Sequence, residues 1–170
     1  MKQNIIITGF MGSGKSVVAE ELARKLGMKF IDMDQIIEER QGMSISDIFD
    51  RYGESYFRKQ ENKLLKELSS KENMVIATGG GTLLSTDNAK ILNEKGEIIC
   101  LYADSKVLYN RVKRKNNRPL LRGENLLDRI NQLVEERKKK YDNIKLKIDT
   151  SDLNIQEVVD RIIDILKNKG

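Results

Sequence analysis

Residues 9–16 read Gly-Phe-Met-Gly-Ser-Gly-Lys-Ser, a complete Gly-x-x-x-x-Gly-Lys-Ser phosphate loop. An apolar, β-branched run at 5–7 precedes the loop, and an amphipathic segment from Lys15 to Leu26 follows it. The motif therefore has the strand–loop–helix context that it requires. Glycines let backbone N–H groups turn toward phosphate oxygens, and a helix N-terminus adds the positive end of its dipole. We expect this loop to bind a nucleoside triphosphate; the alternative is a tight glycine turn without a ligand.

The residues of the loop have distinct expected roles. The backbone of Gly12, Ser13 and Gly14 is expected to surround the phosphates. Lys15 is expected to reach the β- and γ-phosphates, and the Ser16 hydroxyl to ligate Mg²⁺. The loop thus predicts a nucleoside triphosphate as a ligand and Mg²⁺ as the cofactor.

Composition narrows the class of protein. The 170 residues suffice for a single domain, and the formal net charge is +5. Histidine is absent, which excludes Ser-His-Asp catalysis, histidine metal sites and a histidine phosphorelay. The one cysteine, Cys100, lies in an apolar run and is interpreted as a buried strand residue. We find neither a run long enough to span a membrane nor a signal peptide, so we expect a cytoplasmic protein without a membrane partner.

Strand and helix patterns alternate along the chain, which predicts an α/β fold with a mostly parallel sheet covered on both faces. The expected strands are 3–8, 29–31, 74–77, 97–102 and 145–149. The expected helices are 15–26, 33–41, 44–70 with a break near Gly53, 86–95, 104–114, 124–141 and 155–168. Asn154 and Glu157 resemble a capping box for the last helix.

The segment 114–124 has no helical or strand periodicity and contains the only proline, Pro119. We interpret it as a lid between two helices, with an ordinary surface loop as the alternative. It overlaps a run, 111–122, with six basic side chains and no acidic one. Such a run is compatible with nucleic acid, but beside a phosphate loop a small polyanion is the simpler partner.

Asp32-Met33-Asp34 closes the second expected strand. Side chains two residues apart in an extended segment point the same way, so we expect both carboxylates at the ligand edge of the sheet. One of the two carboxylates would hold Mg²⁺ through its water shell, and the other would accept a proton from a substrate hydroxyl. The alternative is that Asp34 only caps the following helix.

Two arginines lie at inward helical positions. Arg58 shares a face with Glu61 and two leucines, and Arg137 shares a face with Ile130 and Tyr141. A guanidinium that points inward needs an anion, which suggests a bidentate clamp for a carboxylate. An ion pair within the helix, between Arg58 and Glu61, is the structural alternative.

Gly79-Gly80-Gly81 follows the expected strand 74–77. Three glycines let a ligand approach bare backbone closely, although a tight turn is also possible. The strand ends in Thr78-Gly79, without the acidic residue that usually completes the second motif of a phosphate-loop enzyme. This absence favours Asp32 as the carboxylate near the metal.

In order along the chain, these motifs resemble those of shikimate kinases over nearly the whole sequence. The resemblance rests on residues 9–16, Asp32-Met33-Asp34, Ile48-Phe49, Gly53-Glu54, Phe57-Arg58 with Glu61, 78–81, Arg118-Pro119-Leu120-Leu121, and Glu136-Arg137 before Tyr141. It implies a P-loop kinase fold like that of nucleoside monophosphate kinases, with a five-stranded parallel sheet in the order 2-3-1-4-5. It also implies one domain over 1–170, with substrate-binding helices at about 33–61 and a lid at about 114–124.

The reaction that the resemblance implies is ATP-dependent phosphorylation of the shikimate 3-hydroxyl, in the pathway to chorismate and the aromatic amino acids. By family pattern, shikimate is held by Asp34, Phe49, Phe57, Arg58, Arg137 and the triplet Gly79, Gly80 and Gly81. Lys15 and Arg118 would address the transferred phosphate, and Arg111 would contact the adenine side. Lys15, Asp34 and Arg118 are thus the expected catalytic residues.

Two other functions stay open at this point. One is a different small-metabolite kinase of the same fold, such as a gluconate kinase. The other is a nucleotide-dependent nucleic-acid-binding protein that uses 111–122 and 137–140, although nine aromatic residues and no tryptophan leave few stacking surfaces. We expect a monomer whose partners are ATP and shikimate, with no nucleic acid.

Overall fold

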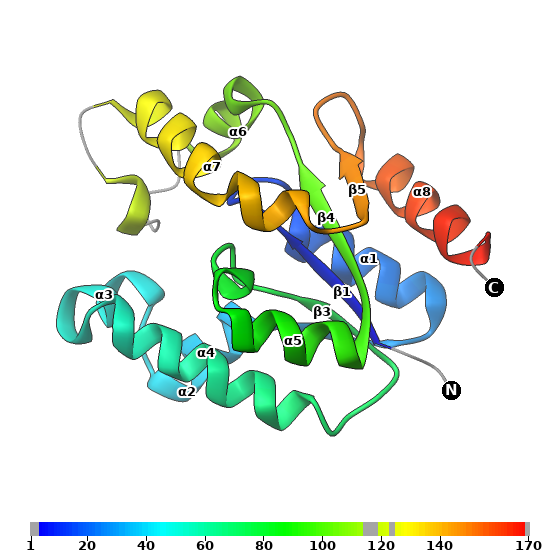
Figure 1. Ribbon diagram of the computed structural model, residues 1–170, viewed down its shortest axis with the longest axis horizontal. Coiled ribbons are helices and arrows are strands. Elements are labelled where there is room, and N and C mark those ends of the chain that lie inside the picture. Colours follow the sequence, from blue (N-terminus) through cyan, green and yellow to red (C-terminus); the bar gives the residue numbers. More distant parts are fainter. Residues whose placement is uncertain (1–3, 114–118, 123–124, 169–170) are drawn as a thin grey trace.

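Five strands form one parallel sheet at the centre of the molecule (Figure 1). The computed structural model describes residues 4–113, 119–122 and 125–168. The strands are β1 (Asn4–Gly9), β2 (Lys29–Asp32), β3 (Met74–Ala77), β4 (Gly96–Tyr102) and β5 (Leu146–Asp149). Their order is β2-β3-β1-β4-β5, and all neighbouring pairs are parallel. The predicted fold class and strand order are confirmed.

The helices follow the predicted segments closely. They are α1 (Lys15–Leu26), α2 (Met33–Gln41), α3 (Ile45–Tyr52), α4 (Glu54–Leu68), α5 (Thr86–Lys95), α6 (Ser105–Val112), α7 (Leu126–Asp142) and α8 (Ile155–Lys167). The predicted helix 44–70 divides at Gly53, whose φ of +81° is readily adopted only by glycine. The capping box of Asn154 and Glu157 at the start of α8 is present. Two 3₁₀ turns, η1 (Thr82–Leu84) and η2 (Pro119–Leu121), were not predicted.

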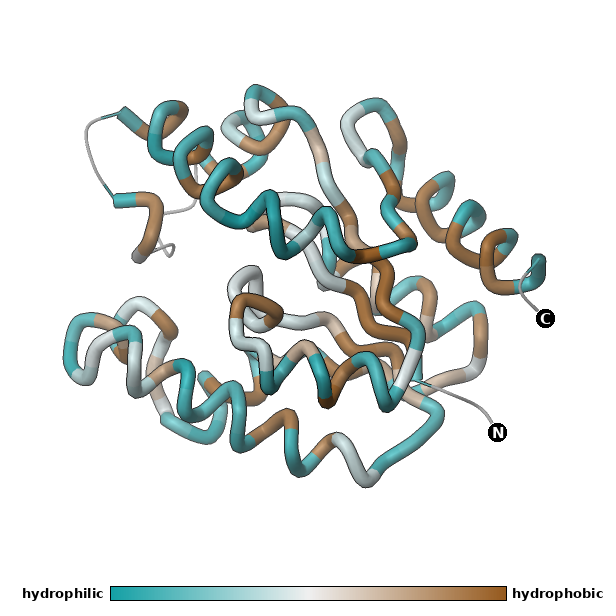
Figure 2. The backbone as a smooth tube through the Cα atoms, in the orientation of Figure 1, coloured by the Kyte–Doolittle hydropathy of each residue, from teal (hydrophilic) through white to brown (hydrophobic). Residues whose placement is uncertain are grey.

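The sheet is apolar on both faces, because helices cover both. Ile5 and Ile7 of β1 point to the face covered by α1 and α8, whose buried residues include Val18, Leu22, Val158, Val159 and Ile162. Ile6 points the other way, into a second cluster with Leu64 and Leu65 of α4 and Leu92 of α5. The brown, hydrophobic strands between mixed helices in Figure 2 show the same arrangement. A continuous apolar run such as 5–7 is what a parallel sheet buried on two faces requires.

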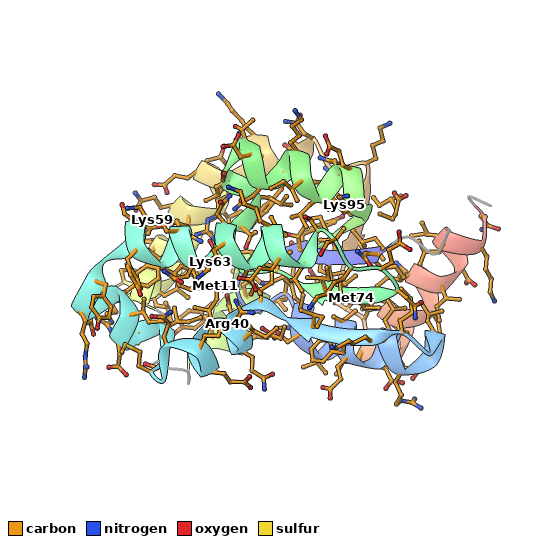
Figure 3. The ribbon with its side chains drawn as sticks, turned by 90° about the horizontal axis from the view of Figure 1, so that it is seen from below. Met11, Arg40, Lys59, Lys63, Met74 and Lys95 are labelled. Atoms are coloured by element: carbon orange, nitrogen blue, oxygen red, sulfur yellow. The ribbon has the colours of Figure 1, made fainter. Side chains whose placement is uncertain are left out.

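Figure 3 shows the face covered by α4 and α5. Lys59 and Lys63 of α4 and Lys95 at the end of α5 lie toward the outside there, whereas Met74 of β3 is buried. In the part of the chain that the structure describes, no helix is both long enough and apolar enough to cross a bilayer.

A third apolar cluster lies beyond the carboxyl end of β1. It joins Phe10 and Met11 of the phosphate loop to Leu108 and Val112 of α6 and Ile130 of α7. The helices α6 and α7 therefore lie on one side of the strand ends, and α2, α3 and α4 on the other (Figure 1). The space between these two groups of helices, at the strand ends, holds the candidate site.

Candidate active site

A cavity of about 540 Å³ opens at the carboxyl ends of the strands. This edge of a parallel α/β sheet is where ligands usually bind. The cavity is lined by most of the residues that the sequence singled out, namely Gly12, Gly14, Lys15, Ser16, Asp32, Asp34, Phe49, Phe57, Arg58, Gly79, Gly80, Gly81, Arg111 and Arg137.

Two of the predicted site residues are not among the lining residues. The Ser13 hydroxyl and backbone N–H both donate to the Phe10 carbonyl, at 2.7 and 3.1 Å, so the buried Ser13 side chain stabilises the loop from behind. Arg118 lies outside the described residues, as does most of the predicted lid at 114–124. Leu120 of η2 does line the cavity.

The phosphate loop packs tightly against its neighbours. A Cβ on Gly9 would lie 2.0 Å from the Leu101 carbonyl oxygen of β4, so only glycine fits there. Gly14, at φ +93°, forms the N-cap of α1. The Lys15 ammonium donates to the Phe10 carbonyl at 3.0 Å, so the side chain folds back over its own loop. The loop thus presents the N-terminus of α1 and an ammonium group to the cavity.

The structure corrects the expected geometry of Asp32 and Asp34. Only Asp32 belongs to the strand; Met33 already begins α2, so Asp34 lies in the first helical turn. The helix cap is Asp32, whose Oδ1 accepts from the Gln35 backbone N–H at 3.1 Å, and not Asp34. Its Oδ2 accepts from the Ser16 hydroxyl at 2.5 Å. Both carboxylates still line the cavity, as predicted, because the chain turns into the helix at its rim.

Two aromatic rings line the other end of the cavity. The rings of Phe49 and Phe57 lie 5.2 Å apart at 47°, and the Arg58 guanidinium stacks 5.3 Å from the centre of the Phe57 ring. Gly53, between α3 and α4, lets the chain turn so that both helices contribute to this wall. The two rings offer an apolar surface against which the face of a ring-shaped ligand would pack.

Arg58 is held by two carboxylates of its own helix. Its Nη1 lies 2.6 Å from Glu61 Oε2, and its Nη2 lies 3.0 Å from Glu54 Oε1. Burial by itself would lower the pKa of the guanidinium, but the Glu61 charge and these hydrogen bonds outweigh burial and raise the pKa. The predicted pair with Glu61 is therefore present, and Arg58 nevertheless lines the cavity. The two interpretations of the sequence are compatible.

Arg137 reaches the cavity from the opposite side, on α7. The residue is only 3% exposed, its guanidinium stacks 5.3 Å from the centre of the Phe10 ring, and its Nη1 donates to the Gly80 carbonyl at 3.2 Å. Lys138, Lys139 and Lys140, which follow it in α7, are exposed. Among the described residues, no carboxylate pairs with Arg137, and its buried Nε has no hydrogen-bond partner. A buried cation in this situation favours an anionic ligand.

Sequence reasoning missed several supporting contacts. Thr82 of η1 is fully buried and donates to Glu61 Oε1 at 2.7 Å, and Tyr141 donates to the Gly80 carbonyl. Thr150 accepts from Arg111 at its hydroxyl oxygen (3.1 Å) and at its carbonyl (2.8 Å). Arg111 also donates to the Gly12 carbonyl at 3.2 Å. The sequence held two signals for these contacts: Thr82 follows the glycine triplet, and Tyr141 shares a helical face with Arg137. Thr150 has none.

Fold and site together define the class. A parallel sheet in the order 2-3-1-4-5, a phosphate loop after β1 and a cavity that the loop lines together with two arginines identify a P-loop kinase of small molecules. The model of the family described as shikimate kinase matches residues 11–167. The chain therefore belongs to the shikimate kinase family.

Individual relatives agree with this membership. The chain is 44% identical to a shikimate kinase of Thermodesulfovibrio yellowstonii, over 95% of this chain and 93% of the relative. Among solved structures, it is similar to the shikimate kinase from Acinetobacter baumannii in complex with shikimate, with a TM-score of 0.95 and 33% identity over 99% of this chain and 95% of the other.

A gluconokinase from Sinorhizobium meliloti is also similar, with a TM-score of 0.59 and 18% identity over 99% of this chain and 98% of the other. At that identity the similarity shows the fold alone. The predicted activity, ATP-dependent phosphorylation of shikimate, is confirmed by the family, and the gluconate-kinase and nucleic-acid alternatives are not favoured.

Proposed function

We propose that the two ends of the cavity bind the two different substrates of this kinase. The phosphate loop end binds the triphosphate of ATP, and the end lined by Phe49, Phe57, Arg58 and Arg137 binds shikimate. In support, the phosphate loop and the two arginines line one continuous space. Phosphoryl transfer depends mainly on positioning and on charge stabilisation, and both substrates must therefore share such a space.

Lys15 stabilises the charge on the transferred phosphoryl group in this proposal. Its ammonium now donates to the Phe10 carbonyl, a neutral acceptor that phosphate oxygens would replace. Lys15→Ala should remove about 3 kcal/mol or more of transition-state stabilisation, the scale of a lost electrostatic donor, and kcat should fall accordingly. Steady-state kinetics of the folded variant test this, and a wild-type kcat would remove Lys15 from the mechanism.

The Ser16 hydroxyl and the Asp32 carboxylate fit a magnesium site. Their oxygens are 2.5 Å apart at the phosphate end, and both are hard oxygen donors. Among the described residues, no group of three or more His, Cys, Asp or Glu side chains could hold a metal. This agrees with an ion held by one or two protein oxygens, substrate phosphates and water. Mg²⁺ would neutralise phosphate charge there.

Asp34 orients the acceptor hydroxyl and receives its proton. The carboxylate belongs to the cavity wall, where a Cβ on Gly79 would come within 2.9 Å of its Oδ1. The bare backbone of Gly79 therefore leaves room for this carboxylate. Phosphoryl transfer through a loose transition state leaves the proton on the hydroxyl until late, so the role of Asp34 is mainly to orient it.

Arg137 is the observation that carries the acceptor assignment. It is a buried guanidinium that lines the cavity, and no carboxylate of the described residues pairs with it. A carboxylate on the substrate would supply the missing charge, and an analogue without one would leave it buried and unpaired. Shikimate carries such a carboxylate on a ring, and the Phe49 and Phe57 side chains offer that ring an apolar surface.

The resemblance assigns Arg118 to the γ-phosphate when the lid closes. An arginine in this role contributes about 10³-fold or more to the rate. Arg118→Ala should therefore lower kcat much more than it weakens shikimate binding. A variant with a normal kcat would rule out this role.

A coupled assay with ATP, Mg²⁺ and a panel of acceptors tests the function directly. We expect turnover with shikimate and none above background with gluconate or nucleoside monophosphates. Turnover of gluconate with equal kcat/KM would contradict the acceptor assignment. The lid, the adenine contact of Arg111, the monomeric state and the cytoplasmic location stay predictions.

A further inference from the structure

Two side chains of α7 converge on one backbone carbonyl beside the cavity. The Tyr141 hydroxyl and Arg137 Nη1 both donate to the carbonyl oxygen of Gly80, the latter at 3.2 Å. The donors are four positions apart in the sequence, so they lie one turn apart on the same face of α7. Arg137 lines the cavity, but Tyr141 is not among the lining residues.

The carbonyl that they share belongs to the middle residue of Gly79-Gly80-Gly81. Glycine tolerates many backbone conformations, so the direction of the Gly80 peptide depends strongly on what holds it. The donors that the structure places on this carbonyl are Arg137 and Tyr141. Without the tyrosine hydroxyl, the carbonyl would depend on the arginine alone, and the loop and the guanidinium could shift together.

The hydroxyl is suited to a permanent donor role. Burial raises the pKa of Tyr141 to about 12, so the phenol keeps its proton well above neutral pH. The hydroxyl hydrogen is therefore present to be donated at neutral pH.

We propose that Tyr141 is a positioning residue for the acceptor substrate: by holding the Gly80 carbonyl, it keeps the Arg137 guanidinium aimed at the substrate carboxylate. Tyr141 itself touches neither substrate. The inference rests on the proposed role of Arg137 in binding shikimate, and it explains why the tyrosine and the arginine lie on one face of α7.

Tyr141→Phe tests this, because it removes one oxygen and keeps the ring. We expect the Kd for shikimate to rise about tenfold, the value of one hydrogen bond to a critical group, with the Kd for ATP within about twofold of wild type. Titration calorimetry measures the Kd for each ligand, and thermal melts measure the stability of the variant. Tyr56→Phe is the matched control, since its hydroxyl bonds to Gln41 at 2.8 Å, away from Gly80; it should leave both Kd values unchanged.

A double-mutant cycle asks whether the tyrosine acts through Arg137. The readout is kcat/KM for shikimate, which stays measurable when binding is weak. In an Arg137→Ala background, Tyr141→Phe should have almost no further effect. A full tenfold loss in that background, a wild-type Kd in the single variant, or equal losses for shikimate and ATP would each overturn the inference. Normal shikimate affinity of Arg137→Ala itself would instead refute the proposed role of Arg137.

Discussion

Two arginines face the same cavity from opposite sides, and their surroundings differ. On α4, Arg58 pairs with the buried Glu61 and with Glu54, and its side chain is 27% exposed. On α7, Arg137 is 3% exposed, bonds to a neutral carbonyl and stacks on Phe10. One cation is neutralised by the protein, and the other has no carboxylate partner among the described residues.

Because of this difference, we expect the two arginines to contribute differently to fold stability and to ligand binding. Removing one partner of a buried ion pair leaves a buried charge, which is strongly destabilising. Removing a cation that has no carboxylate partner leaves no such charge behind, but the substrate then loses its counter-charge. We therefore expect the arginine of α4 to act mainly on the folding equilibrium and the arginine of α7 to act mainly on shikimate affinity.

Arg137→Ala should have the largest effect on binding. We expect shikimate affinity to fall by roughly 2–5 kcal/mol, the usual range for truncating one side of a buried charge pair. ATP affinity should change little, and the melting temperature should fall less than in Arg58→Ala, because no buried charge is left unpaired. Calorimetric titration with each ligand checks this against Lys138→Ala, whose side chain is exposed on the next position of α7. Equal losses for both ligands would make Arg137 a structural residue.

Arg58→Ala should destabilise the fold by about 3 kcal/mol, near the low end for a broken buried pair because Arg58 is partly exposed. The fully buried Glu61 carboxylate is left without its cation. Shikimate binding should weaken as well, but by less than in Arg137→Ala. Urea denaturation measures the loss, and the second substitution Glu61→Gln should recover part of it. A variant as stable as wild type would show that Arg58 and Glu61 do not depend on each other for the stability of the fold.

Thr82→Val should destabilise the fold less than Arg58→Ala does. Thr82 donates to the second oxygen of Glu61, at 2.7 Å, and both residues are fully buried. Losing this donor should destabilise the fold by about 1–2 kcal/mol, since a buried acceptor is left unsatisfied. Denaturation against the exposed control Thr86→Val measures it; no difference between the two variants would remove Thr82 from the support of Arg58.

Alanine substitutions in the glycine triplet should give the smallest effects, and the effect should differ between the glycine beside Arg58 and the glycine beside Arg137. A Cβ on Gly81 would lie 2.5 Å from Arg58 Nη2, whereas a Cβ on Gly80 would lie 3.3 Å from Arg137 Nη1. Gly81→Ala should weaken shikimate binding by about 1 kcal/mol, because the guanidinium must leave its rotamer. Gly80→Ala should cause a smaller loss. A larger loss for Gly80→Ala than for Gly81→Ala in calorimetric titrations would contradict this order of crowding.

Local patterns predicted the parts of the molecule that depend on a few neighbouring residues. The phosphate loop, the sheet strands with their two-sided apolar runs, the break at Gly53 and the capping box are all such parts. The inward position of Arg137 followed from helical spacing alone. The prediction of one extended segment for Asp32 and Asp34 was wrong, although both carboxylates line the cavity, since one turn of chain decides between strand and helix.

The supporting contacts could not be predicted, because they join residues far apart in the chain. Tyr141 and Gly80 are 61 residues apart, Glu61 and Thr82 are 21 apart, and Arg111 and Thr150 are 39 apart. Ser13 belongs to the predicted loop, yet its side chain points behind the loop to Phe10. No periodicity in the sequence reports such pairings.

By itself, the sequence determined the class of fold, the phosphate loop and most of the charged residues that line the cavity, because glycine geometry and apolar periodicity act over short stretches. Only the tertiary structure decided which arginine is already neutralised and which has no carboxylate partner among the described residues. The physical reason is that the free energy of a buried charge depends on every group packed around it, and the groups around Arg58 and Arg137 come together only when α4, α7 and the glycine triplet meet at the strand ends.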